Sequence, residues 1–191
     1  MDLNISGKWA LVTGGANGIG EEISREFAKE GVNLVVTSRT SGPIDKLKDN
    51  LLKYPIEVIG IEVDFLDANW IDDFEAKLKD IPIQILVNNA GHNLNITDPY
   101  CSIEDWNRIL ELNFFTAVRL SNLLIPRMKN AGWGRIVNIT SVAGVENMGP
   151  VTYGVAKASL TTYTRTMGRI LATEGGEVVM TAIFPGVVVT E

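Results

Sequence analysis

The sequence predicts an α/β fold built as a doubly wound parallel sheet of at least six strands. Three observations lead to this prediction. Short apolar runs alternate with amphipathic segments along the 191 residues. These runs are nearly continuous, as in parallel strands that are covered on both faces. The first run ends in glycines directly before a helical segment. Because no internal repeat or linker interrupts the pattern, we expect one domain over residues 1–191.

Strands and helices are predicted in regular alternation. Residues 9–15 form the first strand, and residues 18–31 form a helix that Gly31 closes. The other strands are expected where apolar runs recur, at 32–38, 56–65, 83–91, 134–144 and 178–186. The other helices are expected where apolar residues recur at helical spacing, at 43–53, 68–80, 102–128 and 151–174. Ser102 and Asp105 have capping-box spacing at the start of the long helix.

Charge and hydropathy limit the partners of the chain. The formal net charge is −6, whereas nucleic acids and anionic membranes call for basic patches. The most apolar stretch, 178–189, contains Thr181 and Pro185 and is shorter than the roughly 20 residues of a spanning helix. We therefore expect a small-molecule substrate and neither a nucleic-acid nor a membrane partner.

Three further features concern compartment and metal. The first residues contain an acid and no basic segment, which argues against a secretory signal. The single Cys101 suits a reducing compartment, so we expect a cytoplasmic protein. The single His92 leaves too few histidines for a histidine metal cluster or a Ser-His-Asp relay. No metal site is expected.

The glycine turn after the first strand predicts dinucleotide binding. Glycines let the backbone approach a pyrophosphate, and the following helix supplies free N–H groups. The spacing is G-x-x-x-G-x-G, so the usual G-x-G-x-x-G fingerprint is not met literally, and glycines also serve such turns for geometry alone. The cofactor-binding residues expected here are Gly14, Asn17, Gly18, Ile19 and Gly20.

The end of the second strand predicts which dinucleotide binds. An acid at this place holds the ribose of NAD, whereas a basic residue accommodates the phosphate of NADP. Ser38 stands there and Arg39 follows, so we expect NADP, with NAD as the alternative. The competing interpretation of Arg39 is a side chain that merely points into solvent from a loop.

Tyr153 and Lys157 stand four residues apart, which makes them neighbours on a helix. A free phenol has a pKa of about 10, and a cation within about 4–6 Å favours its ionised form. Between them lie Gly154, Val155 and Ala156, which add little bulk and no charge. The pair therefore predicts a proton-transfer centre, against the simpler interpretation of an ordinary polar helix face.

The motifs together resemble the short-chain dehydrogenase/reductases, including the β-ketoacyl-acyl-carrier-protein reductases. The resemblance covers the chain from its first strand and rests on an ordered set of motifs: TGGANGIG at 13–20, NNAG at 88–91, Asn113, Ser141, Tyr153-x-x-x-Lys157 and PGVVVT at 185–190. It implies a Rossmann-type domain that transfers a hydride between NAD(P) and a carbonyl or secondary alcohol. It also implies a homodimer or homotetramer.

The resemblance implies a role for each matching residue. Tyr153 would be the acid/base, Lys157 its activator and a ribose ligand, Ser141 the hydroxyl that holds the substrate oxygen, and Asn113 the support of a water relay. By pattern alone Asn113 falls on the buried stripe of the long helix, where its amide needs partners. The remaining cofactor-binding residues implied are Asp64 at the adenine, Asn89, Ala90 and Gly91 along the cofactor, Tyr153 with Lys157, and Pro185, Gly186, Val188 and Thr190 near the nicotinamide.

The sequence leaves more than one function open. The sequence stops just after PGVVVT, so we expect a chain truncated before the family's substrate-loop segment and last strand. A dinucleotide-binding module with little or no catalysis is therefore the alternative to an NADPH-dependent carbonyl reductase. A sugar-nucleotide epimerase relative also carries the tyrosine-lysine pair but has a differently spaced glycine turn. A ketoacyl thioester, a small ketone, a sugar and a steroid-like alcohol all stay open as substrates.

Overall fold

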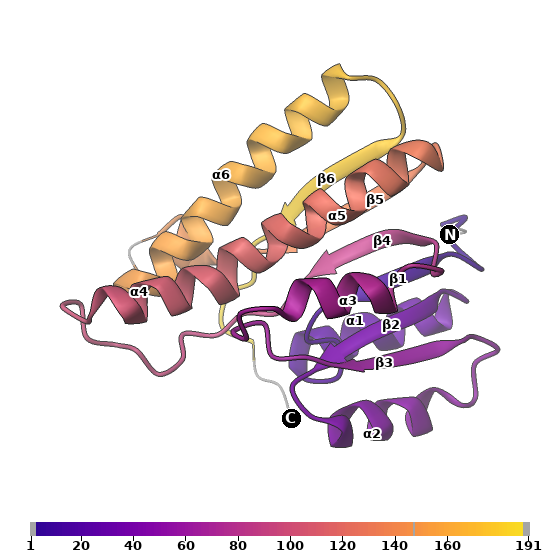
Figure 1. Cartoon of the computed structure of the whole chain (residues 1–191), viewed down its shortest axis with the longest axis horizontal. Coiled ribbons are helices and arrows are strands. Elements are labelled where there is room, and N and C mark those ends of the chain that lie inside the picture. Colours follow the sequence, from indigo (N-terminus) through magenta and orange to yellow (C-terminus); the bar gives the residue numbers. More distant parts are fainter. Residues whose placement is uncertain (1–2, 147, 189–191) are drawn as a thin grey trace. The chain divides into compact units, whose positions relative to one another are not determined.

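The computed structural model describes residues 3–146 and 148–188. This part of the chain divides into two compact units, residues 3–89 and residues 90–188. Both units contain parallel strands, and the strands alternate with helices in the predicted order (Figure 1). The predicted α/β class with six parallel strands is thus confirmed.

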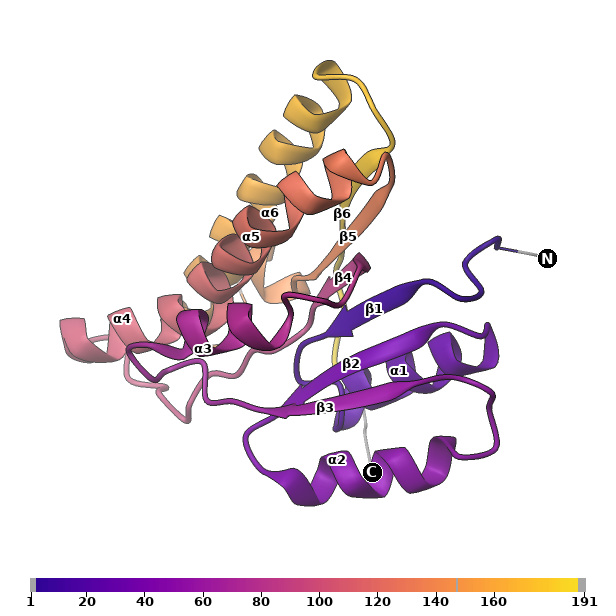
Figure 2. The ribbon, with the colours of Figure 1, turned by 45° about the vertical axis from the view of Figure 1, so that its right-hand side comes forward.

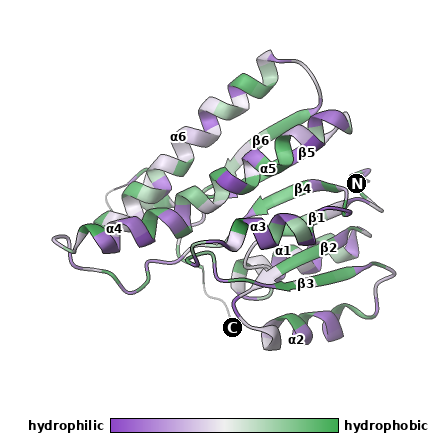
Figure 3. Ribbon diagram, in the orientation of Figure 1, coloured by the Kyte–Doolittle hydropathy of each residue, from purple (hydrophilic) through white to green (hydrophobic). Residues whose placement is uncertain are grey.

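The first unit is a four-stranded parallel sheet in the order β3-β2-β1-β4. Its strands are β1 (Trp9–Val12), β2 (Asn33–Ser38), β3 (Val58–Glu62) and β4 (Ile83–Asn88). Its helices are α1 (Gly18–Lys29), α2 (Ser41–Leu51) and α3 (Trp70–Lys77). Leu11 pairs with Val35 on one side and Leu86 on the other, and all three are fully buried. Because these central strands are covered on both faces, they are mostly apolar in Figure 3.

Helices α1 and α2 lie along the same side of strands β1 to β3 (Figure 2). Helix α1 ends as predicted, since Gly31 has a left-handed φ of 72°. The turn before α1 contains two further left-handed glycines, Gly14 (φ 60°) and Gly18 (φ 51°). Side chains other than glycine rarely adopt this conformation, so the turn depends on glycine at both positions.

The second unit consists of a parallel strand pair and long helices. The strands are β5 (Gly134–Ile139) and β6 (Val178–Ile183). The helical segments are α4 (Ile103–Leu110), the π-helical η1 (Glu111–Phe115), α5 (Thr116–Asn130), the 3-10 helical η2 (Val142–Gly144) and α6 (Val151–Thr173). Helices α5 and α6 both pack against this strand pair (Figure 1). No helix in the described part of the chain has the length and apolar character needed to cross a membrane.

The predicted continuous helix over 102–128 is interrupted by the π-helical turn η1. The predicted cap is present, because the Asp105 N–H donates to Ser102 Oγ at 3.1 Å. Further along, the Asn113 amide donates to the Ile109 carbonyl at 3.0 Å, and Thr116 Oγ1 donates to the Glu111 carbonyl at 2.9 Å. These side chains occupy carbonyl groups that the regular helical ladder would use. A π turn of this kind often marks a functional position in a helix.

Candidate functional site

The glycine turn of the first unit is held by threonine, serine and asparagine side chains. The Gly14 N–H donates to Thr37 Oγ1 at 3.0 Å, and Ser24 Oγ donates to the carbonyls of Gly15 and Gly20, both at 2.9 Å. Ser24 is fully buried. These supports were not predicted from the sequence, since a buried serine on a helix has no distinctive local pattern. They keep the turn rigid without side-chain bulk at its surface.

Asn89 also belongs to the support of this turn. Its Nδ2 donates to the carbonyls of Thr13 (2.9 Å) and Gly14 (3.3 Å), and its own N–H donates to Thr13 Oγ1 at 2.9 Å. A Cβ on Gly20 would lie 2.2 Å from the Gly14 carbonyl oxygen and 2.5 Å from Asn89 Nδ2. The turn is therefore too close-packed for any residue but glycine at position 20.

This turn fits the pyrophosphate of a dinucleotide. Helix α1 begins at Gly18, and the side chain of Asn17 makes no capping hydrogen bond with it. The N–H groups at the helix start, Gly18, Ile19 and Gly20, therefore have no side-chain cap, and the helix dipole favours a negative charge there. The residues of this turn thus suit the pyrophosphate of the predicted dinucleotide.

The remaining predicted cofactor residues of the first unit lie at the ends of its strands. Ser38 is the last residue of β2, and Arg39 follows it with an exposed side chain. Asp64 follows β3 and is half-buried, with its Oδ1 accepting the Leu66 N–H at 2.9 Å. The carboxyl ends of parallel strands are where such sheets bind ligands.

Four predicted side chains of the second unit lie near one another: Asn113, Ser141, Tyr153 and Lys157. Ser141 follows β5 and caps η2, with its Oγ accepting the Ala143 N–H at 3.2 Å. Tyr153 and Lys157 stand on the first two turns of α6, and Lys157 Nζ lies 5.6 Å from the centre of the Tyr153 ring. The neighbourhood that the spacing of this pair predicts is present.

Asn113 lies in η1 and is almost fully buried, as its place on the apolar stripe predicts. Its Nδ2 donates to the carbonyls of His92 (2.9 Å) and Ile109 (3.0 Å). Its buried Oδ1 has no hydrogen-bond partner among the described residues. Since buried polar atoms are nearly always paired, this oxygen is an acceptor available to a water or a ligand.

Lys157 is buried, with 3% of its surface exposed, and its Nζ donates to the Ile139 carbonyl at 2.9 Å. Burial lowers its pKa to about 8, because a charged amine loses its hydration there. Burial likewise raises the pKa of Tyr153, and a hydrogen bond with Ser141 opposes part of that increase. We expected Lys157 to lower the pKa of the phenol. In the chain without a ligand this pKa is raised instead. Desolvation of the phenol outweighs the opposing hydrogen bond with Ser141.

Gly91 is required beside these two side chains. A Cβ at this position would lie 2.7 Å from Asn113 Oδ1 and 2.9 Å from Lys157 Nζ. Gly91 was predicted to line the cofactor. Because glycine has no side chain, this position also leaves space for Asn113 Oδ1 and Lys157 Nζ.

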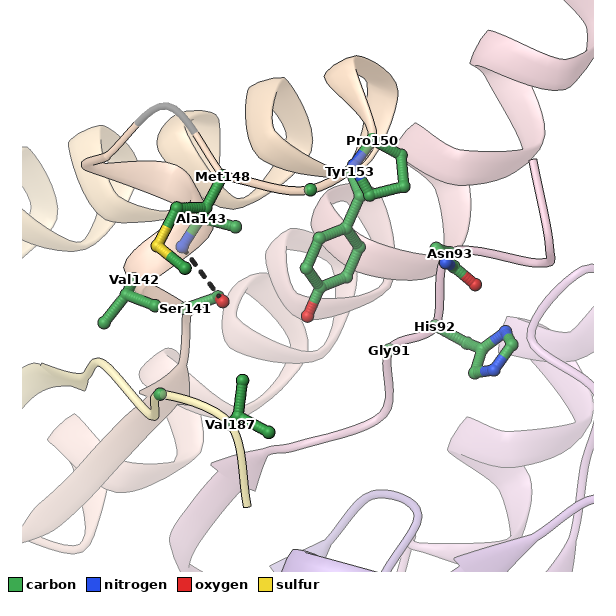
Figure 4. A pocket seen from close by; sticks show the side chains of 12 residues that line it. Gly91, His92, Asn93, Ser141, Val142, Ala143, Met148, Pro150, Tyr153 and Val187 are labelled. Carbon is green, nitrogen blue, oxygen red and sulfur yellow. Dashed lines mark hydrogen bonds between the residues drawn. The ribbon is translucent and has the colours of Figure 1, made fainter. Parts of the chain in front are cut away.

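A cavity of about 420 Å³ opens beside Tyr153 and Ser141 (Figure 4). In Figure 4 the Tyr153 hydroxyl points into the space between Ser141 and Gly91. The other lining residues are His92, Asn93, Val142, Ala143, Met148, Gly149, Pro150, Gly186 and Val187. Of the residues predicted near the nicotinamide, Gly186 lines the cavity, the Pro185 carbonyl accepts the Val142 N–H at 3.1 Å, and Val188 is exposed. Thr190 lies outside the described residues.

The sequence predictions omitted His92 and Asn93 from the site. His92 was considered only as the single histidine of the chain. Its place directly after NNAG, at the end of a strand, was the only signal that could have indicated otherwise.

Replacing Lys157 by methionine is expected to stabilise the chain without ligand near neutral pH. A pKa of about 8 against the ordinary 10.5 means that the protonated amine costs on the order of 3 kcal/mol when folded. Between these two values the unfolded state binds more protons, so stability rises with pH and the cost is fully present below about pH 8. Because the Ile139 carbonyl loses its donor, we expect a net gain of about 1–3 kcal/mol.

Urea unfolding of the wild type and the Lys157→Met variant, near pH 7 and near pH 10, checks this prediction. The advantage of the methionine variant should shrink at the higher pH, because the wild-type amine is then largely neutral in the folded state. A destabilised variant near pH 7, or a difference that does not change with pH, would contradict it.

The comparisons with known proteins agree with this arrangement. A family model described as "short chain dehydrogenase" matches residues 8–191. The 3-oxoacyl-acyl-carrier-protein reductase FabG of Aquifex aeolicus is 30% identical over 100% of this chain and 78% of its own length. The L-sorbose reductase of Gluconobacter frateurii, solved with NADPH and L-sorbose, is 31% identical, with a TM-score of 0.92 over 100% of this chain and 73% of that chain.

A third relative was solved with a different dinucleotide. The short-chain dehydrogenase/reductase of Burkholderia phymatum, in complex with NAD, is 26% identical, with a TM-score of 0.89 over 98% of this chain and 68% of that chain. The chain described here belongs to the short-chain dehydrogenase family, and its fold is the doubly wound, Rossmann-type fold of these structures. It is an NAD(P)-dependent oxidoreductase that acts on a carbonyl or alcohol group.

Proposed function

We propose that the protein reduces an uncharged ketone with NADPH and that Tyr153 donates the proton. The observation that carries this proposal is the gathering of Tyr153, Ser141, Lys157 and Asn113 beside a cavity in the second unit. Ser141 would hold the substrate oxygen through its hydroxyl, and Tyr153 would pass its proton to that oxygen. NADPH, when bound, supplies the hydride that goes to the carbonyl carbon.

We propose that Lys157 and Asn113 assist proton transfer by the Tyr153 phenol. A buried amine with a pKa of about 8 can change protonation near neutral pH, and the open Oδ1 of Asn113 can accept a hydrogen bond next to it. We propose that the proton lost by Tyr153 is replaced through a water between these groups. In the first unit, the glycine turn and Asp64 would hold the pyrophosphate and the adenosine.

NADPH is proposed over NADH because of Arg39. No carboxylate stands at the end of β2 to repel the additional phosphate, and the exposed guanidinium next to Ser38 can bind it with two hydrogen bonds. The solved relative from Gluconobacter frateurii carries NADPH, whereas the one from Burkholderia phymatum carries NAD. Family membership alone therefore does not decide the cofactor, and Arg39 is the residue to test.

One experiment tests both the reaction and the cofactor. The wild type and an Arg39→Ala variant are given a panel of uncharged ketones with NADPH or NADH, and the loss of reduced nicotinamide is followed. We expect turnover with NADPH, and a loss of about 10-fold or more in kcat/KM for NADPH, but not for NADH, in the variant. Equal use of NADH by the wild type would overturn the role of Arg39. Binding of both cofactors without any ketone reduction would favour a dinucleotide-binding module.

The compartment and the assembly are also proposed here. A single cysteine and an acidic net charge support a cytoplasmic location. The exposed apolar side chains of Ile103, Phe115 and Val155 on the helices of the second unit support a homo-oligomer. We propose a homodimer or homotetramer.

A further inference from the structure

Ser141 and Tyr153 must meet for the proposed proton transfer, yet they belong to two different elements. Ser141 directly precedes η2, whereas Tyr153 stands in the first turn of α6. Both residues line the cavity (Figure 4), and a hydrogen bond between them limits the rise in the pKa of Tyr153. The distance between the two hydroxyl groups therefore depends on how closely η2 packs against α6.

Two glycines, one on each element, make this packing close. A Cβ on Gly144 in η2 would lie 2.7 Å from the carbonyl carbon of Lys157 and 2.8 Å from the backbone nitrogen of Ala158. A Cβ on Gly154 in α6 would lie 3.0 Å from the carbonyl oxygen of Ala143. These neighbours are backbone atoms, which cannot turn away as a flexible side chain can. A methyl group at position 144 would thus push η2 and α6 apart.

The contact with α6 is the reason for glycine at position 144. Glycine is often required where the backbone has a left-handed φ, but Gly144 is not among the glycines with such an angle. Its own backbone would accept alanine. Only the approach of the helix backbone at Lys157 and Ala158 excludes a side chain there.

Gly144 and Ser141 belong to one short turn. The Gly144 N–H donates to the Ser141 carbonyl at 3.0 Å, and the Ala143 N–H donates to Ser141 Oγ at 3.2 Å. The turn is also attached to the chain after β6, because the Val142 N–H donates to the Pro185 carbonyl at 3.1 Å. A change in the contact of Gly144 with α6 is therefore passed on to Ser141.

We infer that Gly144 is a positioning residue for the reaction, because the absence of its side chain lets Ser141 reach the Tyr153 hydroxyl. Glycine has no functional group of its own, so it acts through the place that it gives to Ser141. A side chain at position 144 would separate the two hydroxyl groups, which could then no longer bind the same substrate oxygen. This inference rests on the proposed roles of Ser141 and Tyr153 in ketone reduction.

Replacing Gly144 by alanine tests the inference. The full chain with NADPH is given 2-heptanone, acetophenone and L-sorbose, and the ketone that the wild type reduces fastest is used for all variants. Because a displacement of about 1 Å can lower a rate about 10²-fold, we expect kcat to fall by at least about 10-fold. The Kd for NADPH, measured by fluorescence titration, is expected to change by less than about 3-fold, since the glycine turn that binds the pyrophosphate is unchanged.

Gly168→Ala is the matched control. Gly168 stands on the same helix α6 but does not line the cavity, and a Cβ there would lie 2.9 Å from the Met180 carbonyl oxygen in β6. This substitution also crowds a backbone atom, so urea unfolding should show a loss of stability comparable to that of Gly144→Ala. Because Ser141 is not displaced, kcat is expected to stay within about 2-fold of the wild type.

A second comparison shows whether Gly144 acts through Ser141. In a Ser141→Ala background the hydroxyl to be positioned is absent, so adding Gly144→Ala should lower kcat by less than about 3-fold further. If that background has no measurable turnover, the comparison with Gly168→Ala decides. If Gly144→Ala does not fold, Gly154→Ala crowds the same contact less severely from the helix side, and we expect a loss in kcat of at least about 3-fold.

The outcomes are distinguishable. A smaller loss than expected in Gly144→Ala, or an equal loss in Gly168→Ala, overturns the role of Gly144 and leaves ketone reduction in place. The same holds if Gly144→Ala causes its full loss without the Ser141 hydroxyl. Wild-type protein that binds NADPH but reduces none of the three ketones overturns the proposed function, and this inference with it. A loss that is specific to Gly144 and depends on Ser141 is the result that the geometry predicts.

Discussion

Replacing Tyr153 by phenylalanine is expected to lower kcat by about 10²–10⁴-fold while the affinity for NADPH changes little. The phenol hydroxyl points into the cavity between Ser141 and Gly91 in Figure 4. Phenylalanine keeps the ring and removes the transferable proton. Steady-state reduction of a ketone together with NADPH titration by fluorescence measures both effects.

Tyr163→Phe is the matched control for this substitution. Tyr163 stands on the same helix α6 and is also partly buried, yet it does not line the cavity. Its substitution removes the same hydroxyl from the same helix and is expected to leave kcat within about 2-fold of the wild type. If Tyr153→Phe retained kcat within about 10-fold, another group would be the proton donor.

Adding a methyl group at Gly91 is expected to lower activity by displacing Asn113 and Lys157. In Gly91→Ala the new Cβ would need the space of Asn113 Oδ1 and Lys157 Nζ, at 2.7 Å and 2.9 Å. A displacement of about 1 Å in such a group can lower the rate about 10²-fold, and overpacking costs about 1–3 kcal/mol of stability. We expect both losses, measured as kcat and as the urea midpoint of unfolding.

Gly42→Ala controls for the effect of a methyl group elsewhere. A Cβ on Gly42 would meet nothing within 4 Å, and the residue lies in helix α2 without a left-handed φ. Alanine there is expected to raise stability by up to about 1 kcal/mol with unchanged kcat. A folded Gly91→Ala variant with wild-type kcat would show that Asn113 and Lys157 need not stay where the structure places them.

Local pattern was sufficient for much of the fold and for the Tyr153–Lys157 neighbourhood, whereas Ser141 and Asn113 were assigned to the site through the resemblance to a known family. Strand and helix positions follow from hydropathy, which is local, and the Tyr153–Lys157 neighbourhood follows from helical spacing alone. The glycines of the turn at 14 and 18 were predicted from their place between strand and helix, and their left-handed φ angles explain why glycine is required.

Other properties depend on residues that are distant in the chain. The π turn at Asn113 arises from side-chain bonds to nearby carbonyls and, through Nδ2, from a bond to His92, 21 residues away. The pKa of Lys157 depends on its burial, which spacing does not indicate. Asn89 holds the turn at Thr13 and Gly14, some 75 residues earlier. No window of sequence contains both partners of such bonds.

The sequence by itself predicted the class of this protein, the order of its elements and the tyrosine, lysine, serine and asparagine of the candidate site. The order of the elements rests on periodicity, a property of neighbouring residues, whereas the class and the site serine and asparagine rest on the resemblance of the ordered motifs to a known family. Only the tertiary structure decided that burial raises the pKa of Tyr153, that Asn113 keeps an open acceptor, and that the His92 carbonyl accepts from the Asn113 amide. Desolvation and hydrogen bonding depend on which groups meet after the chain has folded, and that is why these features of the site could not be predicted beforehand.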